Sequence, residues 1–311
     1  MNAAPSIQFY PTLRCNADCH FCFNRGLPAA DDVTIDDFQK MVSVLKDAGV
    51  RCIDILGGEP TLHPELLTLL DIIKASQMKS NLSTNGINVP LLNDLSERYD
   101  SKFLRIGISL NSREVSADLH EYIVTHRPVL KSVATAQAAI PKSGEPYLHL
   151  PGIEYFLLYM DAANDKDLQD ALPFYRFIKE LTKLKKVHRG VDGVFCSGFI
   201  PRSGDDPSLK SVRCPAGTTK LSISADGSVY PCYLFFRHEE FKLGNILTDN
   251  FGKIWQNSLL DYFRTFGGNT CRERNCPLAA DCHGGCPAVS YTLRGSCDAP
   301  DPRCREHPPG L

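Results

Sequence analysis

The sequence has no long hydrophobic run and almost no net charge. No apolar stretch approaches the roughly 20 residues that a membrane-spanning helix needs. The first residues, which include Pro5 and Pro11, lack the basic start and apolar block of a secretory signal. The 34 Lys and Arg side chains nearly balance the 36 Asp and Glu side chains, for a formal net charge of −2. We therefore expect a soluble, cytoplasmic protein that binds neither nucleic acid nor membrane.

Cysteine, by contrast, is abundant, with 13 residues in the chain. Without a secretory signal, metal ligation explains them better than disulfides do. Three lie near the N-terminus, Cys52 and Cys196 stand alone, and eight lie between Cys214 and Cys304. This distribution predicts two regions with separate metal chemistry. Cys52 lies inside an apolar run and is expected to be a small core residue.

Short apolar runs alternate with amphipathic segments from about residue 5 to residue 200. Strands are predicted at 6–10, 52–56, 80–84, 103–110, 152–161 and 190–199. Helices are predicted at 34–49, 64–76, 90–99, roughly 114–139 with a break at Pro128, and 167–184. The first helix has Thr34 as its N-cap and Gly49 at its end. Strands that alternate with helices predict an α/β fold, with a parallel sheet curved into a partial barrel.

A stretch rich in Pro, Gly, Ser and Asp, residues 200–211, separates this part from a cysteine-rich tail. We predict a barrel domain at 1–200, and a linker with a metal-binding domain at 201–311. In the tail, "KLSIS" and "SVYPC" flank "ADG" and predict a β-hairpin with Gly227 in its turn. A small, loop-rich region with so many cysteines needs metal to hold it together.

The stretch "LRCNADCHFCFN" follows the first predicted strand and carries Cys15, Cys19 and Cys22 as C-x3-C-x2-C. A four-iron cluster normally takes four thiolates, so three leave one iron able to bind another ligand. Phe21 adds an aromatic face beside the third cysteine. The alternative is a zinc knuckle with His20 as the fourth ligand. In parallel sheets such chemistry lies at the C-terminal ends of the strands.

This loop resembles the signature of the radical S-adenosylmethionine (radical SAM) superfamily, C-x3-C-x-aromatic-C after the first strand of a partial (β/α)6 barrel. The resemblance implies that the amino and carboxylate groups of S-adenosylmethionine chelate the open iron. It also implies that the reduced cluster cleaves this cofactor to a 5′-deoxyadenosyl radical, which abstracts a hydrogen atom from the substrate. An electron donor such as flavodoxin or ferredoxin would reduce the cluster.

Polar motifs follow the next three strands in order. The resemblance assigns "GGEP" after the second strand to the methionine amino group, where Glu59 can accept charge-assisted hydrogen bonds. "STNG" and "ISLN" end the third and fourth strands, and their short side chains suit carboxylate or ribose oxygens. The family often has Asp where this chain has Asn. The cofactor-binding residues predicted in this way are Phe21, Gly57, Gly58, Glu59, Pro60, Ser83, Asn85, Ser109 and Asn111. The alternative for each motif is ordinary turn chemistry, and no catalytic acid or base can be assigned.

The tail resembles the SPASM extension that many radical SAM enzymes carry. The resemblance assigns Cys214, Cys232 and Cys286 to a first auxiliary [4Fe-4S] cluster, and Cys271, Cys276, Cys282 and Cys304 to a second. The expected C-x2-C is C-x4-C here, with Glu273 at the strict spacing, and we retain Cys271 because thiolate is the usual donor. The first auxiliary cluster lacks an obvious fourth thiolate; Cys297, Cys196 or an open iron remain alternatives. Zinc-ribbon scaffolding is the other explanation of the tail.

SPASM proteins mostly modify peptides or proteins, by forming thioether or carbon–carbon crosslinks or by oxidising Ser or Cys. The resemblance therefore implies maturation of a ribosomally made peptide. Because the barrel is predicted to start near residue 6, a leader-peptide-binding protein would be a separate chain. The alternative is a small-molecule enzyme, either a dehydrogenase of a sugar or aminocyclitol or an enzyme of tetrapyrrole or quinone cofactor synthesis. A non-catalytic iron–sulfur carrier would leave GGEP and the strand-end polar residues without a role.

Overall fold

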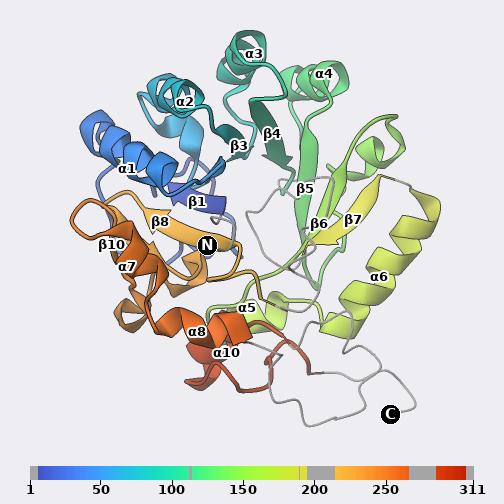
Figure 1. Ribbon diagram of the computed structural model, residues 1–311. Helices are drawn as coiled ribbons and strands as arrows, with labels where there is room; N and C mark the ends of the chain where they lie inside the picture. The colour runs from blue at the N-terminus through green and yellow to red at the C-terminus, as the bar shows by residue number, and fades with distance from the viewer. Residues whose placement is uncertain (1–5, 112–113, 189, 195–213, 266–284, 306–311) are drawn as a thin grey trace. The chain divides into compact units, whose positions relative to one another are not determined.

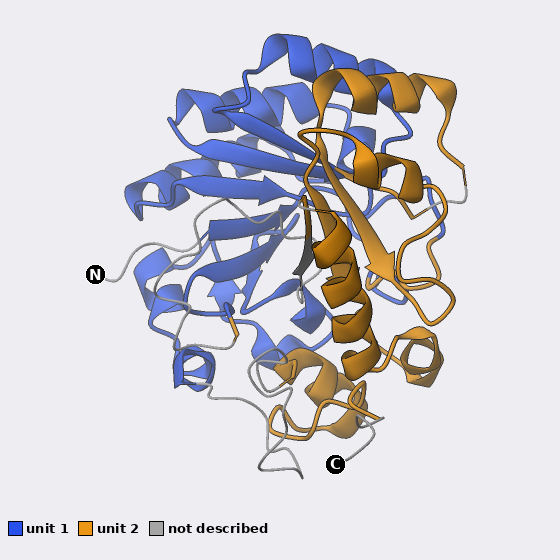
Figure 2. Ribbon diagram, turned by 90° about the vertical axis from the view of Figure 1, so that its right-hand side faces the viewer, with its two compact units in different colours: residues 1–18, 24–107, 215–265 blue, residues 19–23, 108–214, 266–311 orange. Residues whose placement is uncertain are grey.

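The computed structural model describes residues 6–111, 114–188, 190–194, 214–265 and 285–305. The chain divides into two compact units, which Figure 2 shows in different colours. The first unit comprises residues 1–18, 24–107 and 215–265, and the second comprises residues 19–23, 108–214 and 266–311. Five residues of the predicted metal chemistry lie outside the described residues: Cys196, Cys271, Glu273, Cys276 and Cys282.

The first unit is built on a sheet with the strand order β10-β9-β8-β1-β2-β3-β4. Its strands are β1 (Ser6–Tyr10), β2 (Cys52–Ile55), β3 (Lys79–Thr84), β4 (Leu104–Ser109), β8 (Lys220–Ser224), β9 (Ser228–Tyr230) and β10 (Gly244–Asn245). The last two residues of β4 belong to the second unit. Strands β1, β2 and β3 pair in parallel, β8 joins β1 in parallel, and β9 and β10 follow antiparallel.

Helices α1 (Ile35–Asp47), α2 (Leu66–Ala75) and α3 (Val89–Arg98) lie along the outer side of these strands in Figure 1. The predicted cap of α1 is confirmed, because the Thr34 hydroxyl accepts the Asp37 N–H at 3.2 Å. The buried face of α1 includes Phe38, whose ring centroid lies 5.0 Å from that of Phe9 on β1. Local capping and apolar periodicity thus place this helix on the sheet.

The opposite face of the same strands carries a buried polar row. Gln8 on β1 is in register with Asp54 on β2, and Asp54 is in register with Asn81 on β3. The Asn81 side-chain amide donates to Asp54 Oδ1, and Ser222 on β8 donates to Gln8 Oε1 at 3.1 Å. Cys52 is also buried, as predicted, and its thiol donates to Asp54 Oδ1 at 3.5 Å. Hydrogen bonds between neighbouring strands therefore link polar groups that the apolar runs carry inward.

Strands and helices also alternate in the second unit. Its elements are α4 (Ala117–His126), β5 (Val129–Ala134), β6 (Tyr155–Tyr159), α5 (Asp165–Asp170), α6 (Phe174–Val187), β7 (Val191–Val194) and α10 (Pro287–Arg294). Strands β5, β6 and β7 pair in parallel, and Figure 1 shows α6 alongside β7. The predicted α/β architecture is confirmed. The helix predicted at 167–184 is two helices, because Pro173 lies at the N-cap of α6.

The prediction of helical sequence at 114–139 is wrong for its second half. The helix ends at Arg127, which adopts a left-handed conformation, and strand β5 follows Pro128. Val129 and Val133 pack with residues of β6 in an apolar cluster. Strand β5 was missed because Lys131 and Ser132 are polar residues, although both are buried. Tertiary pairing with β6 overrides the local pattern here.

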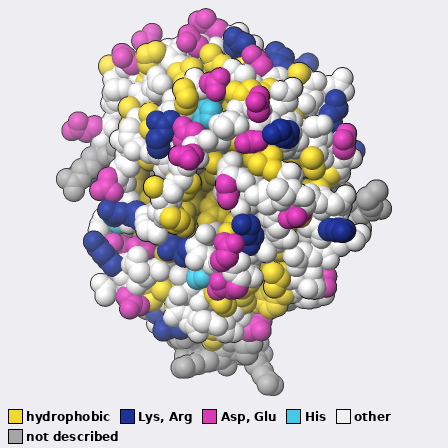
Figure 3. Space-filling model, turned by 90° about the vertical axis from the view of Figure 1, so that its left-hand side faces the viewer, with side chains coloured by type: hydrophobic (Ala, Val, Ile, Leu, Met, Phe, Trp, Pro, Cys, Tyr) yellow, Lys and Arg dark blue, Asp and Glu magenta, His cyan; other side chains and the backbone are white. Residues whose placement is uncertain are grey.

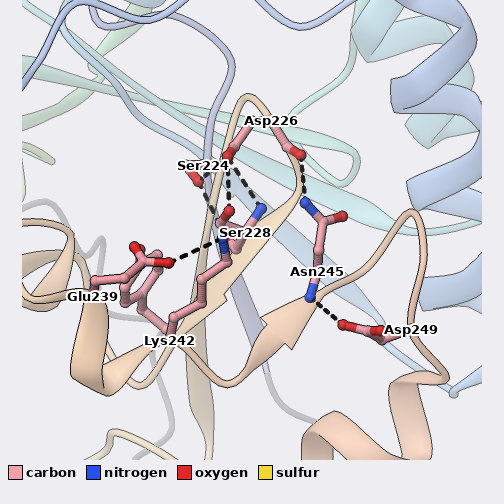
Figure 4. A network of polar contacts seen from close by, with 8 residues as sticks. Ser224, Asp226, Ser228, Glu239, Lys242, Asn245 and Asp249 are labelled. Atoms are coloured by element: carbon pink, nitrogen blue, oxygen red, sulfur yellow. Dashed lines mark hydrogen bonds and ion pairs between the residues drawn. The ribbon is translucent and has the colours of Figure 1, made fainter.

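The hairpin predicted around "ADG" is confirmed. Strands β8 and β9 pair antiparallel, and Gly227 in the turn has φ of +83°. Asp226 organises the turn, because its carboxylate accepts the Ser228 N–H at 3.1 Å and the hydroxyls of Ser228 and Ser224 at 2.7 and 2.5 Å (Figure 4). Burial opposes ionisation of Asp226, but the bonds from Ser224 and Ser228 outweigh it and hold its pKa below the usual value.

Two short helices, α7 (Phe251–Trp255) and α8 (Leu259–Thr265), follow the hairpin in the first unit. None of the helices in the described part of the chain is both long and apolar enough to cross a membrane. On the face drawn in Figure 3, Lys and Arg side chains lie among Asp and Glu side chains. Charges of the two signs are thus mixed on this face, in keeping with the small net charge.

Candidate cofactor site

The start of the cysteine loop is bonded to the GGEP turn through the main chain. The Gly58 N–H donates to Thr12 O at 2.9 Å, and the Glu59 N–H donates to Arg14 O at 2.7 Å. These bonds continue the parallel pairing of β1 and β2 beyond the strand ends. The residue before Cys15, Arg14, is therefore held against the turn that the family resemblance assigns to the cofactor.

Both glycines of this turn are required by the close approach. A Cβ on Gly57 would lie 2.4 Å from Thr12 O, and Gly57 has φ of +143°. A Cβ on Gly58 would lie 2.2 Å from Arg14 O and 2.4 Å from Leu13 O. No side chain fits at these distances, because the atoms that it would meet are main-chain atoms.

Two side chains hold the ends of the loop within the first unit. Arg14 pairs with both carboxylate oxygens of Asp32, and its Nη2 donates to Leu62 O at 2.8 Å. The Asn24 amide donates to Leu13 O at 2.9 Å, so residues 13 and 24 close the loop that carries the three cysteines. Partial burial opposes ionisation of Asp32, but bonds from Arg14 and Thr12 outweigh it and lower its pKa.

Glu59 connects the GGEP turn to the end of β3. Its side chain is 1% exposed. Oε1 accepts the Thr61 N–H at 3.1 Å and the hydroxyls of Thr61 and Thr84, both at 2.7 Å, while Oε2 accepts the Asn85 N–H at 2.7 Å. The remaining acceptor capacity of the carboxylate therefore lies on Oε2. The contact of Glu59 with an ammonium group stays a prediction.

Asn85 joins the same network to the cysteine loop. Its side-chain amide donates to Asn16 Oδ1 at 2.7 Å, and its own Oδ1 accepts the Ile87 N–H at 2.9 Å. Asn16 is the neighbour of Cys15, whose thiol accepts the Ala17 N–H at 3.4 Å. The GGEP turn, the end of β3 and Asn16, which follows the first cysteine, thus form one hydrogen-bonded assembly in the first unit. Ser83 lies near the end of β3 and Pro60 is the last residue of the GGEP turn.

The other two cysteines of the loop belong to the second unit. The Cys22 N–H donates to Cys19 O at 3.1 Å, which makes a tight turn between them. Both side chains are partly exposed. The Phe21 ring meets His20 edge to face at 4.9 Å, and His20 Nε2 lies 4.0 Å from the Asp170 carboxylate.

Ser109 and Asn111 lie at the end of β4 in the second unit, and both are partly exposed. The Asn111 Oδ1 accepts the Val133 N–H at 2.9 Å, and the Leu110 N–H donates to Lys131 O at 2.7 Å. Asn111 thus uses its oxygen on strand β5 and retains its amide hydrogens for another partner. Its contact with a ribose stays a prediction.

The described cysteines of the tail divide between the units. Cys232 lies in the first unit, where it is buried next to the 3₁₀ turn Tyr233–Phe235. Cys214, Cys286, Cys297 and Cys304 lie in the second unit. Burial raises the pKa of the Cys286 and Cys297 thiols to about 12 in each case, and Cys214 contributes electrostatically to both shifts.

Among the described residues, no three His, Cys, Asp or Glu side chains lie close enough together to hold a single metal ion. A cluster of several irons is wider than one ion, so its thiolates need not approach one another as closely. The residues present fit such a cluster, because thiolates are its usual ligands. The glycines of the GGEP turn add main chain without side chains beside the loop.

Comparison with known families agrees with this chemistry. The radical SAM superfamily matches residues 9–174, more than half of the chain, and SPASM, an iron-sulfur cluster-binding domain, matches residues 214–286. The chain belongs to the radical SAM superfamily. The enzyme class and the kinds of cofactor predicted are thereby confirmed: a [4Fe-4S] cluster with S-adenosylmethionine, and auxiliary iron–sulfur clusters in the SPASM region.

Individual proteins resemble the chain over most of its length. The antilisterial bacteriocin subtilosin biosynthesis protein AlbA of Bacillus subtilis (strain 168) is 26% identical over 301 residues, which cover 89% of this chain and 66% of AlbA. The PqqA peptide cyclase of Bradyrhizobium diazoefficiens is 24% identical over 327 residues, which cover 96% of this chain and 85% of the cyclase. The crystal structure of Streptococcus suis SuiB bound to precursor peptide SuiA superimposes with a TM-score of 0.71 at 20% identity, over 98% of this chain and 77% of SuiB. This likeness shows the fold, an α/β partial barrel with a SPASM region.

Sequence reasoning missed the residues that hold the site together. Thr61, Thr84 and Asn16 bind the side chains of Glu59 and Asn85, yet each looks like an ordinary turn residue in the sequence. The signal that could have found them is their position. Thr84 lies within STNG, Asn16 lies within the cysteine loop, and Thr61 directly follows GGEP.

Proposed function

We propose that this chain is a radical SAM enzyme that modifies a ribosomally made peptide or protein, by forming a thioether or carbon–carbon crosslink or by oxidising a side chain. Membership of the superfamily supports the radical chemistry. The peptide substrate is supported by relatives whose names and titles include a peptide cyclase and a complex with a precursor peptide.

Cys15, Cys19 and Cys22 would hold the cluster that binds S-adenosylmethionine. When bound and reduced, this cluster supplies the electron that cleaves S-adenosylmethionine to the radical that takes a hydrogen atom from the substrate. The observation that carries the proposal is the main-chain bonding of residues 12–14 to Gly58 and Glu59. These bonds join the GGEP turn to the residue that precedes the first cysteine, which supports the assignment of both segments to one cofactor site.

The chain's own polar groups would position the cofactor. Glu59 is already anchored by Thr61, Thr84 and Asn85, so it needs no reorganisation to accept an ammonium hydrogen on Oε2. The other predicted contacts of the cofactor are with Phe21, Gly57, Gly58, Pro60, Ser83, Asn85, Ser109 and the Asn111 amide. Ser83, Asn85, Ser109 and Asn111 lie at or near the ends of β3 and β4, and α/β barrels bind their ligands at strand ends.

Two auxiliary clusters would occupy the SPASM region. We assign Cys214, Cys232 and Cys286 to the first, and propose Cys297, which lies in the same unit as Cys214 and Cys286, as its fourth ligand. The second would be held by Cys271, Cys276, Cys282 and Cys304. Thiolate ligation at Cys286 and Cys297 requires that iron displace a proton from thiols whose pKa is raised by burial.

The proposal includes the division of the chain into a barrel domain at 1–200 and a linker with the SPASM domain at 201–311. It also includes the cytoplasm as the site of action, since iron–sulfur clusters and thiolates need reducing conditions. An electron donor such as flavodoxin or ferredoxin would reduce the first cluster. A separate leader-peptide-binding chain would present the substrate.

The test is anaerobic reconstitution with iron and sulfide, reduction, and addition of S-adenosylmethionine with peptides encoded beside the gene. We expect 5′-deoxyadenosine, together with a peptide that has lost hydrogen by mass spectrometry. Cys19→Ala should abolish both products, and Cys52→Ala, a buried strand cysteine, should retain them. Absence of 5′-deoxyadenosine from the reconstituted wild type would refute radical chemistry. Its formation without any change in the peptides, but with oxidation of a sugar or a cofactor precursor, would refute the substrate class.

A further inference from the structure

A buried ion pair lies between the last cysteines of the tail. Asp301 and Arg303 are 7% and 2% exposed. The Arg303 Nη2 donates to Asp301 Oδ2 at 2.7 Å, and the Arg303 Nε donates to Asp301 Oδ1 at 3.0 Å. The Arg303 main-chain N–H also donates to Oδ1 at 3.0 Å. Paired bonds of this kind fix the relative orientation of a guanidinium and a carboxylate.

Asp301 also binds the main chain of two cysteines. Its Oδ2 accepts the Cys286 N–H at 2.8 Å, and its main-chain oxygen accepts the Cys304 N–H at 2.9 Å. The main chain before Cys286 approaches Asp301 closely, because a Cβ on Gly285 would lie 2.6 Å from the Asp301 Cβ. Gly285 also has φ of +86°. One residue thus joins two cysteines that are assigned to different auxiliary clusters.

Arg303 ties this arrangement to the end of strand β6. Its Nη1 donates to Met160 O at 2.8 Å, and its guanidinium lies 4.4 Å from the centroid of the Tyr159 ring. Met160 follows β6 directly. The cation is therefore held by a carboxylate, a carbonyl and an aromatic face, all within the second unit.

Stability alone is a weak reason for this pair. Removing two charges from water is unfavourable, and apolar side chains of similar volume in the same place are often as stabilising or more so. An ion pair supplies what apolar packing does not, which is a set of directional bonds to chosen main-chain groups. Those groups belong here to Cys286, Cys304 and the end of a strand.

We propose that Asp301 and Arg303 form a positioning bracket that sets Cys286 and Cys304 relative to each other and to β6, so that the two auxiliary cluster sites assemble together. The inference rests on the proposed function, because it uses the assignment of Cys286 and Cys304 to separate clusters. Asp301 and Arg303 bind no iron themselves; they act through the main chain of the cysteines.

The test counts iron in a chain that lacks the first cluster through replacement of Cys15, Cys19 and Cys22 by Ala. After anaerobic reconstitution this chain should hold about eight irons, four in each auxiliary cluster. In the same background, Arg303→Met should lower the count to about two or fewer and remove the electron paramagnetic resonance signals of both reduced clusters. Arg305→Met is the matched control, since Arg305 lies in the same segment and bonds only main-chain oxygens of Gln169 and Ala171 among the described residues. It should keep about eight irons.

Unfolding is distinguished from lost positioning by the metal-free proteins. Metal-free Arg303→Met that melts at the wild-type midpoint, yet binds little iron, supports the bracket. If it melts lower, the double variant Asp301→Leu with Arg303→Met decides. If the double variant melts at the wild-type midpoint but still binds little iron, the result supports the bracket. If the double variant also binds about eight irons, the bracket is overturned, because apolar packing alone then suffices to assemble the clusters.

The remaining outcomes are separable. A count of eight irons with unchanged spectra in Arg303→Met overturns the bracket, and a count of about four shows that the sites assemble independently, which also overturns it. A count of four or fewer in the background chain itself contradicts the assignment of two auxiliary clusters. That failure belongs to the proposed function.

Discussion

Replacement of Gly58 by Ala tests the junction between the GGEP turn and the cysteine loop. The new Cβ would lie 2.2 Å from Arg14 O and 2.4 Å from Leu13 O. Both are main-chain atoms, so the turn and the loop must move apart. The Gly58 N–H bond to Thr12 O and the Glu59 N–H bond to Arg14 O would then lengthen or break.

The cost has two parts. Loss of two main-chain hydrogen bonds costs about 1–3 kcal/mol in total, at about 0.5–1.5 kcal/mol for each. Overpacking in a well-packed site typically costs about 1–3 kcal/mol. We therefore expect local opening to become easier by at least about 2 kcal/mol, which is roughly a 30-fold change in the opening equilibrium.

Amide hydrogen exchange of the metal-free protein measures this opening. In the Gly58→Ala variant, the main-chain amides of residues 58 and 59 should exchange at least about 30-fold faster than in the wild type, measured in peptides that span residues 52–62. Gly26→Ala is the control, because Gly26 lies two residues beyond Asn24, has φ of +80° and has nothing within 4 Å that a new Cβ would meet. The control carries only the left-handed backbone strain of about 1–2 kcal/mol and should leave residues 52–62 protected. Wild-type protection of this segment in Gly58→Ala would refute the steric argument.

Three further predictions concern single side chains. Glu59→Gln places an amide where a carboxylate oxygen accepts hydrogen bonds, so at least one of the donors on Thr61, Thr84 or Asn85 loses its acceptor. Urea titration should show a loss of about 1–3 kcal/mol in the free energy of unfolding. A variant as stable as the wild type would contradict the buried network. Thr34→Ala removes the side-chain cap of α1 and should cost about 1 kcal/mol in the same titration; no loss would mean that the cap is satisfied in another way. Asp226→Asn should destabilise the protein at pH 7, because the hydrogen bonds from Ser224 and Ser228 outweigh burial and lower the pKa of this carboxyl in the folded state. The contribution of ionised Asp226 to the free energy of unfolding is complete above the unfolded pKa of about 3.9 and is lost as the pH falls through the folded pKa. The difference in stability between the variant and the wild type should therefore narrow below about pH 4. A difference that stays constant with pH would exclude ionisation as the cause.

The local features of the chain could be predicted from the sequence because neighbouring residues determine them. The cap and apolar face of α1, the turn at Gly227 and the order of motifs after β1 and β2 each depend on a few adjacent positions. Cysteine spacing belongs to the same class, since C-x3-C-x2-C limits the ligands that one loop can offer. These signals sufficed to predict the α/β class and the radical SAM family.

Strand β5 and the Glu59 network could not be predicted in this way. The segment 129–134 is a strand because it pairs with β6, and its buried Lys131 hides the apolar pattern. The partners of Glu59 come from residue 61 and from residues 84 and 85, which meet only because β2 and β3 pair in parallel. Side-chain contacts between such segments depend on strand register, which local sequence does not determine.

The sequence by itself determined which residues can carry the chemistry, because cysteine thiols and glycine turns have properties that hold in any fold. Only the tertiary structure decided how those residues are supported. It shows Glu59 buried among four donors, Asn16 bonded to Asn85, and Asp301 joining Cys286 to Cys304. The physical reason is that a buried polar group is stable only with its partners in place, and the chain supplies those partners from residues distant in sequence.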